Sequence, residues 1–242
     1  TIPQINNKHI LPYKSLLPPL TEQKRIAEIL STWDRAIETT EKLIANSEAQ
    51  KKSLMQQLLT GKKRLPGFSG EWRYGRICDV STRVNRRNDG QNLPILTISS
   101  TQGFVRQDKK FSRYMAGKSA DDYISLRTGE FAYNKGNSKT YEFGCIFPLK
   151  DYPEALVPHV YVCFAIKPGH DADFYKVLFE SDYLRPQLRR IVKTGVRNNG
   201  LLNITPAEFL ETTVPVPPLN EQRAIAASLS VATEIVRKLT DK

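Results

Sequence analysis

The sequence predicts a mixed α/β (α+β) domain of about 150 residues that is framed by long α-helices. Two observations predict this fold class. A ten-residue pattern that begins a helix occurs twice, at residues 18–27 and again at residues 217–226. Between the two copies, apolar runs of strand length alternate with segments rich in turn-forming residues.

The repeat joins the two ends of the chain. PPLTEQKRIA at residues 18–27 superposes on PPLNEQRAIA at residues 217–226, and the same offset pairs Ile5 with Ile204 and Leu11 with Leu210 more weakly. In each copy two prolines stop the preceding structure, and a glutamate suits the positive end of a helix dipole. We therefore expect a helix after each proline pair, with Thr21 and Asn220 as the N-caps.

The first helix is predicted to cover residues 20–60 and to stop at Gly61, because no proline or glycine interrupts that stretch. Its apolar residues recur in steps of four and three, which is the heptad spacing of a coiled-coil seam, with polar interruptions at Thr40, Ser47 and Lys51. A helix of this length needs a partner; a surface helix lying on the domain's own core is the alternative. The predicted partner-facing residues are Ile26, Leu30, Trp33, Ile37, Ile44, Leu54 and Leu58 in the first copy and Ile225, Leu229 and Val236 in the second.

The middle of the chain is predicted to contain both strands and helices. Strands are expected at Leu93–Ser99, Glu130–Asn134, Phe143–Leu149 and Leu156–Ile166, and helices at Ala172–Leu184 and, after Pro186, at Gln187–Val192. Gly, Asn, Asp and Lys clusters separate these runs and are typical of turns and loops. We interpret the whole stretch as one domain.

The formal charge of +11 is concentrated in that middle stretch. Residues 20–60 contain six basic and six acidic side chains, whereas residues 61–218 contain 24 basic and 16 acidic ones. A cationic domain favours an anionic partner, most simply nucleic acid. The neutral helix is better suited to contacts with protein.

Four loop segments of the domain combine lysine and arginine with asparagine, serine or aromatic residues. Lysine and arginine neutralise phosphates, while asparagine and arginine can pair with base edges, so this mixture favours sequence readout over purely electrostatic binding. The predicted DNA-facing residues are Arg83, Arg86, Arg87, Lys109, Lys110, Arg113, Lys135, Asn137, Ser138, Lys139, Tyr141, Arg197, Asn198 and Asn199.

Motifs of catalysis are not found in the sequence. Gly117–Ser119 ends like a phosphate-binding loop, but the first glycine that such a loop requires is replaced by Ser112. The three histidines have no cysteine or carboxylate at metal-ligand spacing, and Asp121 and Asp122 are adjacent, so they point to opposite sides of an extended chain. We expect neither a catalytic residue nor a metal site. Three scattered cysteines and the lack of a membrane-spanning run indicate a cytoplasmic protein.

Three motifs together resemble a known family. PPLTEQ at residues 18–23, LLTGKKRLPGFSGEW at residues 58–72 and PPLNEQ at residues 217–222 are similar to segments of the specificity subunit of type I restriction–modification enzymes. The resemblance covers essentially the whole chain. It implies two long helices packed antiparallel, like a coiled coil, as a spacer between target-recognition domains. By this resemblance, residues 1–17 are the tail of a preceding recognition domain, 18–61 a spacer helix, 62–215 a DNA target-recognition domain and 216–242 a second, truncated spacer helix.

The resemblance also implies a function and partners. A subunit of this family has no active site and reads double-stranded DNA, with each recognition domain taking one half of a bipartite target. Its helices dock methyltransferase subunits, which bind S-adenosylmethionine and modify adenine, and restriction subunits join the full complex. We therefore expect no cofactor on this chain, and a homodimer through the spacer helices if the chain is a half-subunit rather than a fragment.

Two alternatives remain from the sequence. The chain could be a coiled-coil interaction module whose basic loops are incidental, which predicts no salt-dependent DNA binding in any assembly. It could instead be a nuclease that uses scattered carboxylates, which predicts metal-dependent cleavage by the purified chain alone.

Overall fold

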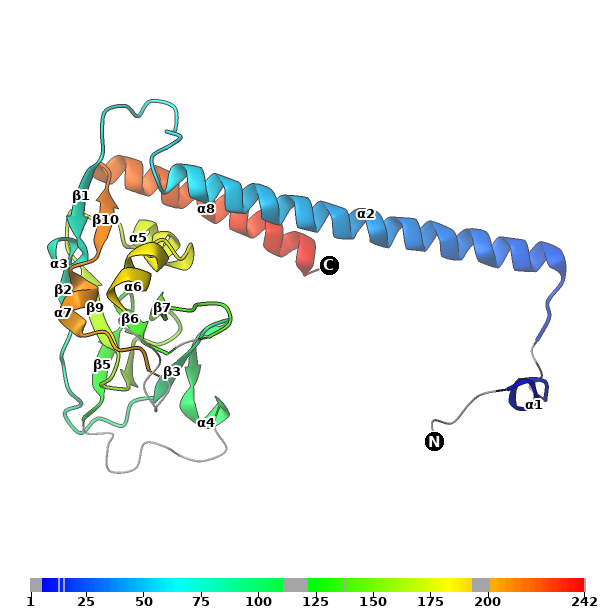
Figure 1. Cartoon of the computed structure of the whole chain (residues 1–242), viewed down its shortest axis with the longest axis horizontal. Coiled ribbons are helices and arrows are strands. Elements are labelled where there is room, and N and C mark those ends of the chain that lie inside the picture. Colours follow the sequence, from blue (N-terminus) through cyan, green and yellow to red (C-terminus); the bar gives the residue numbers. More distant parts are fainter. Residues whose placement is uncertain are drawn as a thin grey trace.

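The structure, a computed structural model, describes residues 6–12, 14, 16–110, 122–136, 138–192 and 201–241, with the side chains of Lys109 and Lys110 excepted. A long helix leads into an α/β domain, and a second helix leads back along the first (Figure 1). The helices are α1 (Asn7–Ile10), α2 (Leu20–Leu58), α3 (Ile77–Val80), α4 (Gln107–Lys110), α5 (Ala172–Glu180), α6 (Arg185–Ile191), α7 (Pro206–Leu210) and α8 (Leu219–Thr240).

The long helix α2 confirms the prediction from the heptad seam, at 39 residues and about 58 Å. Beyond its end, Gly61 takes a φ of 70°, a left-handed conformation that glycine adopts without strain. The predicted N-caps were wrong, because Pro19 and Pro218 are the capping residues and neither Thr21 nor Asn220 caps a helix. The extended backbone of each proline lets its carbonyl oxygen accept the first helical N–H groups, so each helix begins two residues earlier than a Thr21 or Asn220 cap requires.

Helices α2 and α8 lie side by side and run in opposite directions (Figure 1). Between residues 41 and 53 of α2, Ile44, Ser47 and Lys51 are half-buried and every other residue is exposed. The seam then continues through the half-buried Leu54 to the buried Leu58. Its counterpart on α8 runs from the buried Ile225 and Leu229 through the half-buried Ala232, Val236 and Leu239. The predicted seam therefore packs helix on helix over this stretch.

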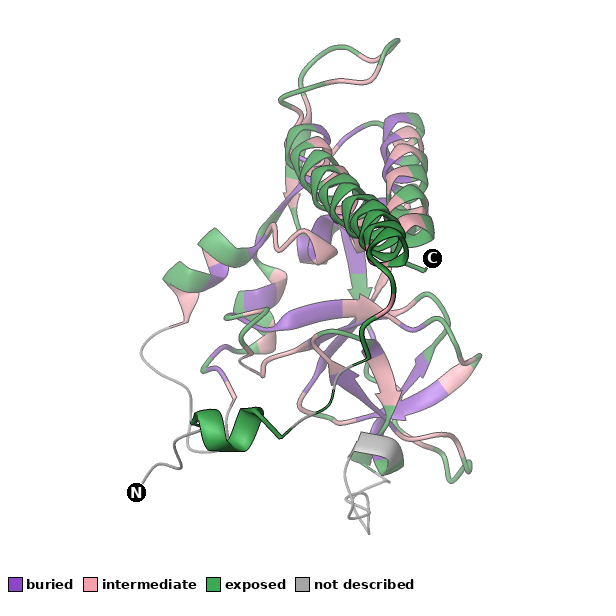
Figure 2. Cartoon of the chain, turned by 90° about the vertical axis from the view of Figure 1, so that its right-hand side faces the viewer, coloured by how far each residue is buried: buried purple, intermediate pink, exposed green. Residues whose placement is uncertain are grey.

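The first half of α2 extends beyond α8 and is exposed (Figure 2). Its seam residues Ile26, Leu30, Trp33 and Ile37 are 45%, 58%, 65% and 54% exposed. They have no helix partner within the described residues, because α8 runs beside only the domain-proximal half of α2. An exposed apolar stripe of this length is typical of a surface that binds another protein segment.

Four antiparallel sheets build the domain, in the strand orders β1-β10, β2-β9-β6-β7, β3-β4 and β5-β8. The first and last strands of the domain pair with each other, with Arg73 opposite Val216 and Arg76 opposite Thr213. The strands are β1 (Arg73–Arg76), β2 (Ser81–Arg83), β3 (Leu96–Ser99), β4 (Gly103–Arg106), β5 (Ile124–Arg127), β6 (Phe131–Asn134), β7 (Cys145–Pro148), β8 (Glu154–Val157), β9 (Val162–Ile166) and β10 (Thr213–Val216).

The four-stranded sheet separates two apolar cores. Side chains alternate along β6, so that Phe131 and Tyr133 enter one core and Ala132 enters the other. Helices α5, α6, α7 and α8 and the end of α2 close the first core, and β3, β5 and β8 close the second. The domain is thus three-layered, with helices on one face of the central sheet and β-ribbons on the other.

Several predicted elements differ from the observed ones. Residues 156–166 form parts of two strands instead of one, because Pro158 begins a turn whose carbonyl accepts the Tyr161 N–H. The helix expected after Pro186 begins before it, at Arg185, because proline is tolerated in the first turn of a helix. The remaining predicted strands and α5 are present with shorter bounds.

No helix in the described part of the chain combines the length and apolarity needed to cross a bilayer. The cysteines Cys78, Cys145 and Cys163 are all free thiols, as expected. Cys163 lies in the central sheet, where burial raises its thiol pKa to about 12. Cys145 is also buried, whereas Cys78 is half-buried and its thiol donates to Glu211 Oε1 at 3.7 Å.

Candidate functional site

The start of α8 is held to the domain by a buried glutamate. Glu221 is wholly buried and accepts hydrogen bonds from Arg64 Nε at 2.5 Å, from Arg64 Nη2 at 2.6 Å and from the Trp72 indole N–H at 3.0 Å. Arg64 and Trp72 belong to the connector between α2 and β1, residues 59–72. The guanidinium also lies over the Trp72 ring, 5.4 Å from its centroid, which adds a cation–π contact.

The next residue, Gln222, completes this junction. Its side-chain N–H donates to the Pro217 carbonyl at 2.8 Å, and its side-chain oxygen accepts the backbone N–H of Asp171, the N-cap of α5, at 2.8 Å. Glu221 and Gln222 thereby fix the connector, α5 and α8 relative to one another. In the second copy of the repeat, the Glu-Gln pair therefore holds the start of α8 to the domain.

The first predicted DNA-facing segment divides into engaged and unengaged arginines. Arg86 forms an ion pair with the mostly buried Glu130 at 2.6 Å, and Arg87 forms a solvent-exposed one with Asp122 at 3.2 Å. Arg83 at the end of β2 is exposed, and its side chain has no hydrogen bond or ion pair to any described residue. Arg83 can therefore bind a ligand without breaking an existing ion pair, whereas Arg86 would have to break a partly buried one.

The segment from Lys135 to Tyr141 is largely occupied by its own turn. Ser138 Oγ accepts the Tyr141 N–H at 3.0 Å, and the Tyr141 ring packs edge-on against Phe147. Lys135 donates to the Ile204 carbonyl at 3.4 Å, whereas Lys139 is exposed and bonds to no described residue. Burial raises the pKa of the Tyr141 hydroxyl, as expected of a packed side chain.

The other predicted residues are only partly covered by the structure. Lys109 and Lys110 end helix α4, but their side chains lie outside the described part. Arg113, Asn137, Arg197, Asn198 and Asn199 lie outside the described residues altogether.

The structure places two of the predicted segments beside parts of the chain that are distant in sequence. Arg87 bridges to Ile124, so the first segment lies beside the start of β5. The Lys135 backbone carbonyl accepts the Leu202 N–H at 2.9 Å, and Gly136 forms a β-bridge with Leu201. The segment from Lys135 to Tyr141 therefore lies beside the chain that follows Asn199 in the sequence. Residues far apart in sequence therefore adjoin on one domain.

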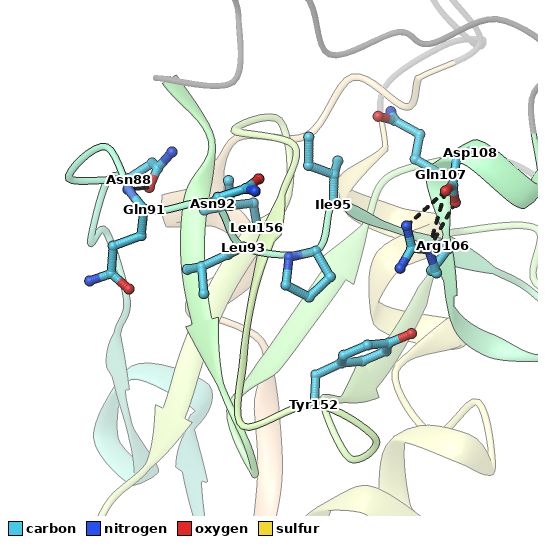
Figure 3. A pocket seen from close by; sticks show the side chains of 11 residues that line it. Asn88, Gln91, Asn92, Leu93, Ile95, Arg106, Gln107, Asp108, Tyr152 and Leu156 are labelled. Atoms are coloured by element: carbon cyan, nitrogen blue, oxygen red, sulfur yellow. Dashed lines mark hydrogen bonds and ion pairs between the residues drawn. The ribbon is translucent and has the colours of Figure 1, made fainter.

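A pocket of about 470 Å³ lies between the continuation of the first segment and the residues just before the second (Figure 3). One wall carries Asn88, Gln91 and Asn92, and the opposite wall carries Arg106 and Gln107, with further lining from Leu93, Pro94, Ile95, Asp108, Tyr152 and Leu156. The Gln107 side-chain oxygen is buried and bonds to no described residue, an uncommon state for a buried acceptor. Sequence reasoning missed these carboxamides, because single Asn and Gln residues carry no signal until the fold assembles them.

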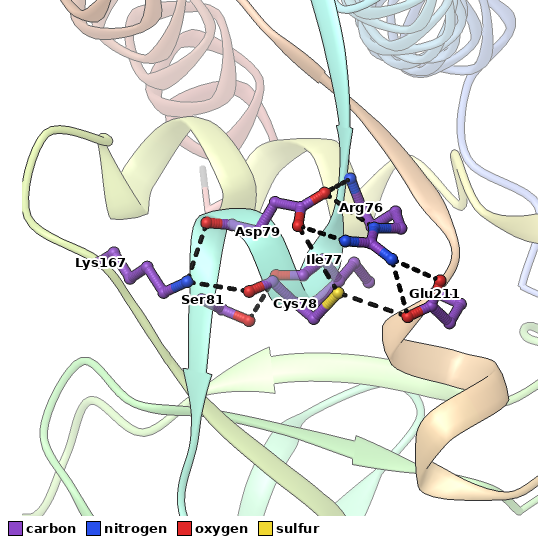
Figure 4. Close-up of polar contacts among 7 residues, drawn as sticks. All are labelled: Arg76, Ile77, Cys78, Asp79, Ser81, Lys167 and Glu211. Carbon is purple, nitrogen blue, oxygen red and sulfur yellow. Dashed lines mark hydrogen bonds and ion pairs between the residues drawn. The ribbon is translucent and has the colours of Figure 1, made fainter.

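One arginine bridges two carboxylates beside helix α3 (Figure 4). Arg76 donates to Asp79 at 2.8 Å and to Glu211 at 3.0 Å, and its hydrogen bonds lower the pKa of Asp79 to about 2. Lys167 donates to the carbonyls of Cys78 and Asp79 at 2.9 and 3.0 Å. These contacts tie β1 and α3 to α7 and β9, so the two carboxylates are structural.

The described histidines, cysteines and carboxylates form no cluster of three or more that could hold a metal ion. His9 lies in the short helix α1, where its Nδ1 accepts the Asn6 N–H at 3.2 Å. Burial lowers the pKa of His170, which packs beside the Tyr175 ring. Neither arrangement supports the nuclease alternative.

Comparisons with known proteins agree with this architecture. The family model of the type I restriction modification DNA specificity domain matches residues 1–48. The chain is similar to the type I restriction enzyme MjaVIII specificity subunit of Methanocaldococcus jannaschii, at 44% identity over 97% of this chain and 59% of that protein. It also matches the putative MjaX specificity subunit of the same organism, at 24% identity over 96% of this chain and 55% of that protein.

Solved structures share the fold. The HsdS subunit from Thermoanaerobacter tengcongensis superposes with a TM-score of 0.56 at 20% identity, over 93% of this chain and 54% of that one. The type I S subunit from M. genitalium gives a TM-score of 0.53 at 14% identity, over 92% and 56%. The chain spans little more than half the length of each protein it matches.

Proposed function

The chain belongs to the specificity-subunit family of type I restriction–modification systems, and we propose that it reads one half of a bipartite double-stranded DNA target without an active site of its own. The observation that carries the proposal is the 44% identity to a type I specificity subunit along nearly the whole chain. The resemblance inferred from the sequence motifs is thereby confirmed. DNA modification and binding to the other subunits are proposed for the complete enzyme that contains this chain.

We propose that residues 62–215 are the DNA target-recognition domain, after a recognition-domain tail at residues 1–17. The cationic surplus of residues 61–218 supports this assignment, because phosphate neutralisation dominates affinity for DNA. Exposed and unengaged cations such as Arg83 and Lys139 suit phosphate contacts. The pocket between Asn92 and Gln107 adds carboxamides, which can pair bidentately with adenine.

We propose that α2 and α8, in residues 18–61 and 216–242, form the spacer on which methyltransferase subunits dock, with restriction subunits joining the complete complex. The equal numbers of acidic and basic side chains in residues 20–60 support protein contacts over DNA contacts. S-adenosylmethionine would then belong to the methyltransferase subunits, and the compartment would be the cytoplasm. Three free cysteines are compatible with that compartment.

Self-association through the exposed part of α2 is a further part of the proposal. Trp33 and Ile37 are more than half exposed, and an uncovered heptad seam favours a second helix. Sedimentation equilibrium of the chain tests this, with a dimer expected at micromolar concentration. A clean monomer at that concentration would contradict self-association.

A domain exchange tests the proposed reading of DNA. In a host that carries the complete system, the stretch from β1 to β10 is replaced by the equivalent stretch of a relative, and modified adenines are mapped by sequencing. One half of the bipartite motif should change while the other half and the spacer length stay the same. A replacement confined to the exposed face of α8 is the control and should leave both halves unchanged.

Measurements on the same complete system distinguish the proposed function from the alternative one. If the assembled enzyme with this chain shows no salt-dependent DNA binding, and the exchange leaves the modified motif unaltered, the chain is a coiled-coil interaction module with incidental basic loops. The ion pairs of Arg86 and Arg87 are the observations that favour that alternative.

A further inference from the structure

The pocket between Asn92 and Gln107 is walled by segments that the backbone holds in place (Figure 3). Gln107 donates its backbone N–H to the Ile95 carbonyl at 3.0 Å, and Leu156 donates its own to the Pro94 carbonyl at 2.9 Å. Ile95 also forms a parallel β-bridge with Leu156. These backbone groups are bonded within the protein, so side chains are what the pocket offers to a ligand.

Two carboxamides on opposite walls bond to no described residue. Gln107 is only 9% exposed, and its side-chain oxygen is buried without a donor. The Asn92 carboxamide is exposed. By contrast, the Asn88 oxygen accepts the Gln91 N–H at 3.1 Å, and the Gln91 amide donates to Asp89 at 3.1 Å. Asn92 and Gln107 are therefore the carboxamides that keep both a donor and an acceptor for a ligand.

The two charged residues of the lining neutralise each other. Arg106 Nε donates to Asp108 Oδ1 at 3.0 Å, and Arg106 Nη2 donates to Asp108 Oδ2 at 2.8 Å. Among the described residues around the pocket, no unpaired cation is left to select a phosphate. The lining therefore favours a neutral ligand.

An aromatic ring and aliphatic side chains complete the lining. Tyr152 is half-buried, and the Thr128 hydroxyl fixes its segment by donating to the Tyr152 carbonyl at 2.7 Å. The volume of about 470 Å³ lies within the range of small-molecule sites. Aromatic faces stack on nucleobases and carboxamides pair with their edges, so a pocket with both kinds of group suits a planar base.

A base that is paired within a duplex does not suit this pocket. Its Watson–Crick edge is engaged and its faces are stacked on neighbouring pairs, whereas Gln107 is nearly buried. Readout in the major groove requires side chains that reach out into the groove. A base reaches a recessed carboxamide only when it is unpaired and unstacked.

We propose that the pocket between Asn92 and Gln107 binds one unpaired nucleobase, stacked on Tyr152. The base has an exocyclic amine beside a ring-nitrogen acceptor, as adenine and cytosine do. Its amine donates to the Gln107 oxygen, which turns toward the base about the soft terminal torsion of the side chain, and Asn92 bonds to a second edge. The base comes from bound DNA or from a free nucleoside, and the first source rests on the proposed function.

Saturation-transfer NMR on the full chain tests the site. The probes are 2′-deoxyadenosine and 2′-deoxycytidine at millimolar concentration, and their base protons should receive saturation from the protein. Thymidine has no exocyclic amine and should bind several-fold more weakly. The absence of saturation for every nucleoside, or equal binding of thymidine, would overturn the proposal.

Gln107→Met separates a binding role from a packing role. The variant keeps a similar volume without an acceptor, so nucleoside affinity should fall about tenfold, within the range for a bidentate base contact. The melting temperature should stay the same or rise, because a buried acceptor without a donor is removed. Unchanged affinity would overturn the proposal. Gln102→Met is the matched control and should change neither quantity, since Gln102 is exposed at the turn of the same hairpin and does not line this pocket.

Mismatch scanning in the complete enzyme identifies the source of the base. After the modified motif is mapped, single base pairs of the half that this domain reads are mismatched in turn. A mismatch removes the cost of unpairing, so at a position whose base enters the pocket it should tighten binding about tenfold. Gln107→Met should lose that gain and Gln102→Met should keep it. If no position shows a gain that depends on Gln107, the pocket takes its base from a free nucleoside.

The pocket and the proposed function fail separately. If no nucleoside binds while the domain exchange still changes one half of the modified motif, the pocket assignment is wrong and DNA reading stands. If nucleosides bind through Gln107 but the exchange leaves the motif unaltered, DNA reading is wrong and the pocket stands.

Discussion

Arg64 and Glu221 are 157 positions apart in the sequence and are joined by two parallel hydrogen bonds of 2.5 and 2.6 Å. The carboxylate is wholly buried, whereas the guanidinium is 21% exposed along its side chain. This pair closes the domain, because it ties the segment that enters β1 to the helix that leaves β10. Its geometry is bidentate, the arrangement in which arginine binds carboxylates most strongly.

Removing the carboxylate should weaken the domain closure. Glu221→Ala leaves Arg64 and the Trp72 N–H without their acceptor, so the melting temperature should fall by about 5–10 °C, and Glu221→Gln should have a smaller effect. Circular dichroism at the helix band measures the shift. Glu234→Ala in α8 is the control, since the Glu234 side chain is 45% exposed and pairs with Arg237 and Lys238 of the same helix; an equal shift in both variants would refute the role of Glu221.

Gly144 should tolerate no side chain. Its φ is 85°, and an added Cβ would collide with the Asn134 carbonyl oxygen and the Tyr133 ring, both in β6. Gly144→Ala should therefore lower the free energy of unfolding by about 3 kcal/mol or more, measured by urea titration. Gly129→Ala, with a φ of 83° and open space around the new Cβ, should lower it by only about 1–2 kcal/mol.

Asp182 is a site where substitution should stabilise the fold. Burial raises the pKa of its carboxyl, and its φ of 58° is uncommon for a residue other than glycine, with asparagine and aspartate among the more frequent exceptions. A raised carboxyl pKa means that folding is favoured while Asp182 is protonated and is penalised as pH rises through the folded-state pKa.

Asp182→Asn removes that penalty and keeps a residue that accepts a positive φ. The stability advantage of the variant over the wild type should grow as pH rises from about 4 to 7. Thermal melts across that range measure the difference. An advantage that stays constant or shrinks with pH would show that the Asp182 carboxyl is not responsible.

Lys139 should contribute to DNA affinity through a phosphate. In the assembled enzyme Lys139→Ala should weaken binding to all sequences similarly and reduce the slope of log K against log salt by about 0.9. Lys42→Ala on α2, where Lys42 pairs with Glu38, should leave the slope unchanged. Arg86→Ala is a poorer test, because it also leaves the mostly buried Glu130 without its ion pair.

The long helices were predictable because their signal is local and repeated. Heptad steps from Ile26 to Leu58 fixed the face of α2 that packs, and the structure covers that face, partly or fully, where α8 runs beside it. The N-caps were mispredicted because Thr21 and Asn220 are favourable capping residues by type. The backbone of the preceding proline took that role instead.

The strands of the domain were harder to predict because most are four residues long. β1, with the sequence RYGR, has no apolar alternation and exists because it pairs with β10. The carboxamide pocket was missed for a related reason, since Asn92 and Gln107 come to line one pocket only after β3 and β4 form a hairpin. Charge alone suggested these loops as DNA-facing and could not reveal that Glu130 already binds Arg86.

Because β1 pairs with β10, the distance between the points where the chain enters and leaves the domain does not depend on the length of the domain. Because these two strands are hydrogen-bonded neighbours, the chain enters and leaves the domain about one strand spacing apart, near 5 Å. Residues gained or lost in the loops between them would leave that spacing unchanged, and with it the offset between α2 and α8. The β1–β10 pairing therefore makes the relative position of α2 and α8 independent of the loop sequences within the domain.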